Sequence, residues 1–297
     1  FRRVLFRSLA SVQFDWTRCT DASPASMALM VYGIDTNPVL ISFDNSYGGT
    51  FVVPTGSYKF IGYNDDSREL FTRGSSYADF QIYSQHTSLS AFAPMFAQTR
   101  VVPRAPETES QAIMMEPDEL WTAAQPDILL ISDRDNQLAM PMQEAVKTYH
   151  FTITNVENLQ YATELAGTIS GMSEAWIPSE GCGSEVECII PFTLQSDGQS
   201  TLSGTVRTFG HCPHNTGADG DEHNDHKLVL YVKMSDGNKY YYTFDITKSM
   251  HDADPGGTGT SPSQGGETVA DVDILLDDVP LPKPLNNGAG IHPEVSE

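Results

Sequence analysis

Apolar and polar residues alternate most clearly between residues 227 and 247. Apolar side chains recur at every second position on both sides of a short polar break, which predicts two half-buried strands. A two-residue turn would place the two apolar rows on opposite faces of the sheet. A three-residue loop at 235–237, with Gly237 left-handed, corrects this register. The predicted facing pairs are Val232 with Tyr240, Leu230 with Tyr242 and Leu228 with Phe244.

Shorter segments with the same alternation follow one another along the chain, separated by turn residues. The predicted strands lie within residues 12–16, 26–32, 39–44, 50–53, 77–83, 128–131, 149–153, 165–171, 189–192, 203–210 and 270–278. Gly167 and Gly171 are predicted to mark close packing or bulges. The composition, with 39% hydrophobic residues, 23 Gly and 18 Pro, is typical of a β-rich protein with many turns.

Two domains are the better expectation for a chain of 297 residues. Residues 93–126 lose periodicity and gather prolines, so we interpret them as an excursion over the surface, with a helix start at 117–121. Residues 128–131 are predicted as the closing strand of the first domain, and 133–141 as the boundary. The predicted fold class is all-β, with two tandem antiparallel β-sandwich domains at 11–135 and 142–285. A tail follows at 286–297.

The first eight residues, FRRVLFRS, look like the translated end of a sequencing adapter. We therefore expect residues 1–10 to be an artefactual or unstructured N-terminal tail, and the N-terminus of the protein to be truncated. A short basic flank of a signal peptide is the alternative, but the apolar core and cleavage site that should follow it are missing. Three of the 17 basic residues lie in this segment.

The formal net charge of −22 disfavours nucleic acid and anionic membrane surfaces as partners. No apolar run is long enough to cross a membrane. Cys182 and Cys188 are candidates for a disulfide in an oxidising compartment, whereas Cys19 is expected to be structural. No C-x-x-C pair supports a zinc ribbon or a thioredoxin-like site.

Residue types that bind metals gather at 211–226. They are His211, Cys212, His214, Asp219, Asp221, His223, Asp225 and His226. Their spacing matches no zinc finger, and the EF-hand glycine and glutamate are absent, so a solvated polar loop is favoured over a metal site. The sequence therefore predicts no metal ligands and no cofactor, and leaves open whether this loop binds metal.

Catalytic signatures are also absent from the sequence. It contains no nucleophile elbow, zincin helix, P-loop or dinucleotide fingerprint, so no enzymatic activity is predicted. Adjacent acids such as Asp65 and Asp66 would point to opposite faces of a strand and do not form a glycosidase pair. Tyr241 faces away from the predicted apolar row and is a candidate glycan contact. Tyr240 and Tyr242 are better explained by cross-strand packing.

Two groups of motifs carry a family resemblance. VQFDW at 12–16, PTGSY at 54–58 and YN at 63–64 resemble the N-terminal domain of fimbrillin-like surface lipoproteins of the Bacteroidetes type. TVRTFG at 205–210, the hairpin at 227–247 and an acidic strand leading to PLPKP at 280–284 resemble their C-terminal domain. The resemblance covers nearly all of residues 11–297 and implies transthyretin-like sandwiches.

This resemblance implies a cell-surface, outer-membrane lipoprotein that acts as a structural, accessory or anchoring component of fimbriae in adhesion or assembly. Its partners would be other fimbrial subunits or host and glycan ligands, and its only membrane attachment an N-terminal lipid anchor that precedes this sequence. Cys19, inside the first loop, is a poor candidate for the anchor. A surface glycan-binding lipoprotein is the alternative function.

Fimbrillin-like subunits resemble one another in joining by strand addition, and residues 269–279 suit that use best. Their apolar row consists of Val272, Ile274 and Leu276. These residues form either a donor strand for the next subunit or the closing strand of their own domain, with acids along the outer face to discourage aggregation. The closing strand is favoured for the isolated protein.

Overall fold

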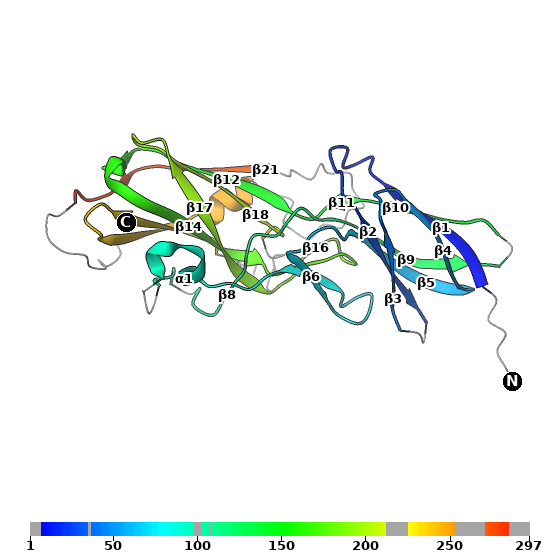
Figure 1. Ribbon diagram of the computed structural model, residues 1–297. Helices are drawn as coiled ribbons and strands as arrows, with labels where there is room; N and C mark the ends of the chain where they lie inside the picture. The colour runs from blue at the N-terminus through cyan, green and yellow to red at the C-terminus, as the bar shows by residue number, and fades with distance from the viewer. Residues whose placement is uncertain are drawn as a thin grey trace. The chain divides into compact units, whose positions relative to one another are not determined.

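The computed structural model describes residues 7–34, 37–97, 102–106, 108–132, 134–211, 225–253 and 271–284. The chain forms two compact units of β-sheet (Figure 1). Unit 1 comprises Phe1–Tyr83, Asp118–Val146 and Ala175–Cys182, and unit 2 comprises Ser84–Pro117, Lys147–Glu174 and Gly183–Glu297. The all-β sandwich class predicted from the sequence is confirmed.

Unit 1 contains a smaller sheet of order β10-β1-β4 and a larger sheet of order β11-β9-β5-β2-β3. The smaller sheet consists of β1 (Arg7–Asp15), β4 (Gly48–Pro54) and β10 (Asn136–Pro141). The larger consists of β2 (Met27–Gly33), β3 (Val39–Phe43), β5 (Gly56–Asn64), β9 (Trp121–Leu130) and β11 (Gln143–Glu144). Both sheets contribute to one apolar core, in which Phe14 meets Phe43 edge to face at 5.9 Å.

A third sheet of unit 1 has the order β16-β15-β7-β6. Its strands are β6 (Leu70–Arg73), β7 (Gln81–Ser84), β15 (Ala175–Ile177) and β16 (Cys182–Gly183). Just before β7, Phe80 is buried and packs against Tyr32 of β2 and Tyr63 of β5. The second face of the larger sheet is therefore covered as well, which explains why β5 is buried from Phe60 to Asn64.

Unit 2 is built on one hydrogen-bonded path of order β20-β19-β14-β17-β18-β12-β21, with β8 paired to β17. The strands are β8 (Ala112–Ile113), β12 (Lys147–Ile153), β14 (Ala162–Ser173), β17 (Glu187–Ser196), β18 (Leu202–Thr208), β19 (Lys227–Met234), β20 (Lys239–Asp245) and β21 (Asp271–Leu276). A separate pair joins β13 (Val156–Glu157) to β22 (Val279–Pro280). The helical segments are α1 (Leu89–Phe92), η1 (Pro94–Phe96), η2 (Leu159–Tyr161) and α2 (Thr247–Ala253).

Strand β17 joins the two layers of unit 2. Its first part pairs with β14, and residues 194–196 pair with β18. Phe192, next to this switch, stacks on Phe151 of β12 at 5.2 Å. Gly167 of β14 makes room for the Phe192 ring, because a Cβ at Gly167 would lie 2.6 Å from it. The close packing predicted for Gly167 is confirmed.

The two units share one strand order. In the larger sheets, β9-β5-β2-β3 of unit 1 corresponds to β20-β19-β14-β17 of unit 2, and in the smaller sheets β10-β1-β4 corresponds to β21-β12-β18. In each unit the first and last of these seven strands pair in parallel, β1 with β10 and β12 with β21, and the other pairs among the seven are antiparallel. The same seven-strand framework therefore occurs twice.

Two boundary predictions are wrong. The stretch predicted as the domain boundary contains β10, which closes unit 1 by pairing with β1, so residues 128–131 do not close the first domain. The predicted N-terminal tail at 1–10 includes the start of β1, where Arg7 and Ser8 face Pro54 and Val53. Ser8 and Ala10 are buried, because they continue the inward row of this strand. Residues 1–6 lie outside the described residues.

The predicted hairpin is confirmed in register. Val232 faces Tyr240, Leu230 faces Tyr242 and Leu228 faces Phe244. In the loop, the Gly237 N–H donates to the Met234 carbonyl at 2.9 Å, and Gly237 has φ of +86°. These features are those of a three-residue loop with a left-handed glycine.

Strand β19 differs from the half-buried strand that its alternation predicts, because both of its faces are buried. Residues of α1 and η1 pack over the outer face, where Phe96 meets Tyr231 edge to face at 5.0 Å. Part of the predicted surface excursion at 93–126 therefore belongs to a second apolar layer on this sheet.

The helix start predicted at 117–121 is absent from the structure. Asn64 bonds to Glu119 and Trp121 and holds this stretch extended.

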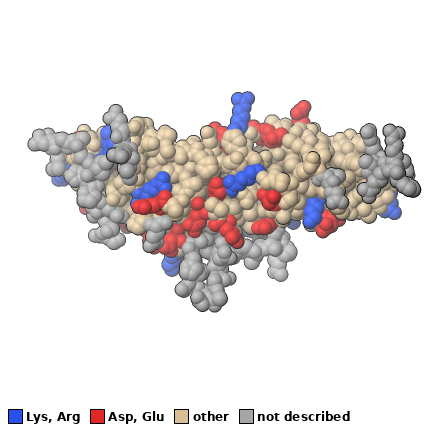
Figure 2. All heavy atoms as spheres, turned by 90° about the horizontal axis from the view of Figure 1, so that it is seen from below, with Lys and Arg blue, Asp and Glu red and all other residues tan. Residues whose placement is uncertain are grey.

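Acidic side chains gather over part of the face shown in Figure 2, and the basic side chains on that face are scattered. Within the described ranges, none of the helices has the length and apolar character needed to cross a bilayer.

Candidate functional site

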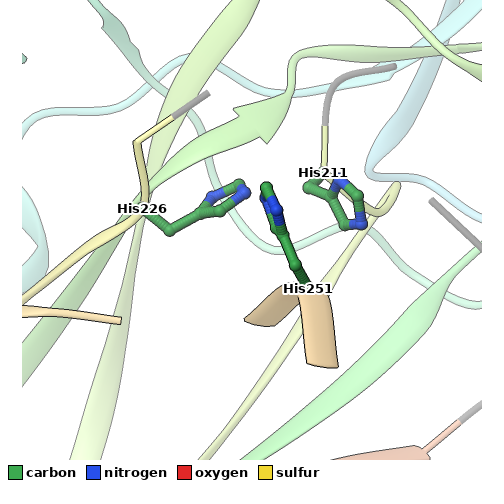
Figure 3. Close-up of side chains that lie close together, drawn as sticks. All are labelled: His211, His226 and His251. Carbon is green, nitrogen blue, oxygen red and sulfur yellow. The ribbon is translucent and has the colours of Figure 1, made fainter. Parts of the chain in front are cut away.

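Three histidine side chains from separate parts of unit 2 converge on one point (Figure 3). They are His211 after β18, His226 before β19 and His251 on α2. One ligating nitrogen from each ring lies within 4.8 Å of the other two. The ring centroids are 5.4 Å apart for His211 and His226, and 5.3 Å apart for each of these with His251. This histidine cluster is the candidate site.

His226 is held by neighbouring elements at both its ring and its backbone. Its residue is fully buried, and its Nδ1 lies 3.1 Å from the carbonyl oxygen of Ser170. Its backbone N–H donates to the Thr247 hydroxyl, and its carbonyl accepts from the Ile246 N–H. Strand β14 therefore positions the His226 ring, and the segment leading into α2 positions its backbone.

A bulge in β14 makes the space that His226 occupies. The pairing of β14 with β17 changes register between Ile169 and Met172, and Gly171 within this bulge has φ of +75°. A Cβ at Gly171 would lie 2.7 Å from the His226 Nδ1. Glycine is therefore required here both for the left-handed backbone and for the close approach of the ring. The bulge predicted at Gly171 is confirmed.

The other two histidines are also set by neighbouring elements. His211 is buried and forms an isolated β-bridge with Met172, just beyond the bulge. His251 lies in the last turn of α2 and is half-buried. Met250 beside it is fully buried, so the helix is anchored to the core of unit 2.

Acidic groups lie close to the cluster. The Gly171 N–H donates to the Gln111 side chain, whose amide donates to the Glu187 carboxylate at 2.6 Å. Burial raises the pKa of the Glu187 carboxyl, the Gln111 hydrogen bond lowers it, and the negative charge of Asp225 raises it further; the net shift is upward. Gln111 therefore connects the Gly171 bulge to Glu187.

Sequence reasoning found part of this cluster. His211 and His226 belong to the group of metal-binding residue types at 211–226, and the structure brings these two together. The predicted candidates Cys212, His214, Asp219, Asp221 and His223 lie outside the described residues. His251 was not predicted. It lies 25 positions after His226 in the sequence, and the turn from β20 into α2 brings the two together.

The other predicted positions lie apart from the cluster in the fold. Cys182 belongs to β16 and Cys188 to β17; no disulfide joins them in the described structure, and their pairing stays a prediction. Tyr241 is half-buried against the layer formed by α1 and η1 rather than fully outward. Tyr242 is buried, as predicted for cross-strand packing, and its hydroxyl donates to the Pro280 carbonyl.

The predicted apolar row of β21 faces its own sandwich. Val272 and Ile274 are buried and Leu276 is half-buried, whereas Asp273 and Leu275 between them are exposed. The strand pairs in parallel with β12 from Asp271 to Leu276 and ends the sheet order of unit 2. In this arrangement it is the closing strand of its own unit.

Residues 7–193 match a family described as a domain of unknown function, DUF5119. The chain belongs to this family. Among curated proteins, none is significantly similar to it in sequence.

Solved structures of Bacteroidetes proteins share the fold over almost the whole chain. A candidate adhesin from Bacteroides ovatus has a TM-score of 0.66 at 18% identity, with 93% of this chain and 94% of that chain covered. A candidate polysaccharide-binding protein from Bacteroides thetaiotaomicron has a TM-score of 0.56 at 10% identity, with coverage of 91% and 90%. The fimbrial anchor protein Mfa2 from Porphyromonas gingivalis has a TM-score of 0.53 at 12% identity, with coverage of 92% and 91%.

Proposed function

We propose that this DUF5119 protein is a non-enzymatic cell-surface component of fimbriae that acts in adhesion or assembly. The main support for the proposal is that the structural match extends over both sandwiches. It covers 93% of this chain and 94% of the Bacteroides ovatus candidate adhesin. The fimbrial anchor protein with the same two-unit fold supports a structural or anchoring place in the fibre. The motifs at 54–58 and 205–210 support a fimbrillin-like lipoprotein.

In this proposal the protein is exported and held at the outer membrane by an N-terminal lipid, and its partners are other fimbrial subunits. Strand β21 is the segment through which subunits would join, by leaving its own unit and completing the sheet of the next subunit. It lies at the end of its sheet, and its apolar row, which fills its own sandwich here, would fill the groove of the next subunit.

Immunogold labelling of cells that produce the full-length gene product tests the surface location. We expect gold along surface fibres, and we expect radioactive fatty acid to label the protein. The same cells with residues 269–297 deleted should lose the fibre label, and limited proteolysis of unit 2 then separates loss of joining from unfolding. Deletion of 285–297 alone keeps β21 and β22 and should retain the label. A protein found only inside the cell would contradict the proposal.

Glycan binding at the cell surface is the second candidate function. It is favoured by the shared fold of the candidate polysaccharide-binding protein and by the partly exposed ring of Tyr241. A glycan array should then give a signal that Tyr241→Ala removes without unfolding unit 2, as checked by circular dichroism. Equal array signals from the parent protein and the variant would exclude Tyr241 as the contact.

A further inference from the structure

We propose that His211, His226 and His251 form a zinc site in unit 2. Imidazole nitrogen is a preferred ligand of zinc, and three histidines with an open fourth position are an established protein ligand set. All three side chains come from unit 2, and one nitrogen from each lies within 4.8 Å of the others. This inference is independent of the fimbrial function proposed above.

The positions of the rings fit a metal centre. Zinc binds imidazole nitrogen at about 2.0–2.1 Å, so three rings at tetrahedral angles have centroids about 5 Å apart. The observed centroid separations are 5.3, 5.3 and 5.4 Å, an almost equilateral triangle. One ligating nitrogen of each ring lies within 4.8 Å of the other two, so zinc binding would draw these nitrogens closer together.

The hydrogen bond at His226 selects the tautomer that a metal needs. The Ser170 carbonyl can only accept, so the His226 Nδ1, 3.1 Å away, carries the proton and donates it. Nε2 of the same ring then carries the lone pair, and this atom is shielded from solvent. A metal-binding histidine typically donates its second ring nitrogen to a carbonyl in this way, which fixes the ring and raises its basicity.

Several features of the fold position these rings. Gly171 has no side chain, which leaves room for the His226 ring. The Gly171 N–H donates to the Gln111 side chain, whose amide donates to the Glu187 carboxylate. A core built for packing alone needs apolar residues at such positions, as at the neighbouring Met172 and Met250.

Zinc at this point would connect three parts of unit 2: the segment after β18, the start of β19 and helix α2. The ion would then join the two connections that contain the ligands, 209–226 and 246–270. We therefore expect zinc to stabilise unit 2 against unfolding, because the ion binds the folded arrangement only.

Isothermal titration of the tag-free, chelator-treated protein with Zn²⁺ tests the site. We expect one zinc per chain, no comparable binding of Ca²⁺ and a rise in the melting temperature with zinc. His251→Gln should weaken zinc binding at least tenfold and abolish the rise in melting temperature. His150→Gln is the matched control, because His150 lies on β12 of the same unit and is hydrogen-bonded to Thr205.

His251 separates this site from binding by the polar loop alone, because it lies outside residues 211–226. Zinc binding that survives His251→Gln and is lost in the double variant His214→Gln/His223→Gln would overturn the proposal. Absence of zinc binding by the folded protein would overturn it as well.

X-ray absorption at the zinc edge keeps the test valid if a histidine variant fails to fold. In the unaltered protein we expect three imidazole nitrogens at about 2.0–2.1 Å from the ion. A shell dominated by sulfur, or one with fewer than three imidazoles, would contradict the assignment.

Discussion

The two units have the same strand order but differ in the connections between corresponding strands. In unit 1, only Thr55 separates β4 from β5, and residues 131–135 separate β9 from β10. The corresponding connections of unit 2 are 209–226 between β18 and β19, and 246–270 between β20 and β21. The long hairpin connection of unit 1, residues 65–120, corresponds to the three-residue loop at 235–237 of unit 2.

The histidine cluster lies in the two connections that are long in unit 2 and short in unit 1. His211 and His226 stand at the two ends of the first, and His251 stands on α2 in the second. The shared framework therefore determines the fold, whereas the longer connections of unit 2 contain the candidate site. Loops on a rigid scaffold commonly have this role.

Removal of β21 has the largest expected effect. Deleting residues 269–297 takes away the parallel partner of β12 and the buried side chains of Val272 and Ile274, each worth about 1.5–3 kcal/mol of burial. We expect unit 2 to unfold while unit 1 keeps its structure, as measured by limited proteolysis and circular dichroism.

Deletion of 285–297 alone is the control for that experiment, because it leaves β21 and β22 in place. A chain that stays folded without β21 but no longer joins surface fibres would identify the strand as a donor. Normal folding together with normal incorporation would show that β21 matters to neither.

Side chains added at two inner-strand glycines should have the next largest effect, one in each unit. A Cβ at Gly62 of β5 would lie 2.8 Å from Phe14, and a Cβ at Gly167 of β14 would lie 2.6 Å from Phe192. Replacement by Ala should cost about 1–3 kcal/mol of unfolding free energy in the unit that carries it. Differential scanning calorimetry should show one transition lowered in each variant.

Gly56→Ala is the matched control, because its Cβ would lie 3.6 Å from Tyr58, an ordinary contact. If Gly167→Ala lowers both transitions equally, the two units do not unfold as separate cores.

The left-handed glycine of the unit 2 hairpin gives a smaller effect. Gly237→Val should destabilise unit 2 by about 1–2 kcal/mol, because a β-branched residue is strained at positive φ. Gly237→Asn, which tolerates this conformation, should cost less. Equal melting temperatures for the Val variant and the parent would contradict the loop geometry.

Asp245, at the end of β20, gives the smallest effect. Burial disfavours its charge, but hydrogen bonds from Lys227 and Thr247 outweigh burial and lower its pKa to about 2. Its contribution to stability is therefore present above about pH 4, near its ordinary pKa, and is lost as the pH falls towards 2.

Since the Asp245 side chain is 63% exposed, solvent screening limits the contribution to less than about 1 kcal/mol. In Asp245→Asn the free energy of unfolding should therefore fall slightly less between pH 5 and pH 2 than in the parent protein, as measured by urea unfolding. An identical pH dependence would show that this ion pair contributes nothing.

Local patterns in the sequence predicted many of the strands and one hairpin register, because side-chain alternation and turn chemistry act between near neighbours. The register at Val232 and Tyr240 follows from the apolar rows alone. The parallel closure by β10 could not be predicted in this way, because it depends on Leu138 and Met140 meeting β1 across more than a hundred residues.

The candidate site was predictable only in part for the same reason. His211 and His226 lie in one polar stretch, but spacing along the chain gave no reason to add His251. Its place next to them depends on the turn from β20 into α2, where the Thr247 hydroxyl holds the His226 backbone. Gly171 was the nearest signal, since a glycine inside a strand pattern indicates a bulge or a close approach.

Hydrogen exchange with and without Zn²⁺ tests most directly the claim that unit 2 carries a metal centre on a framework shared with unit 1. Zinc added to the metal-free protein should slow amide exchange at 209–211, 225–234 and 247–253, because the ion holds these segments together. The corresponding connections of unit 1, at Thr55 and at 131–135, should exchange at unchanged rates. Equal slowing in both units, or no slowing around the three histidines, would contradict the account.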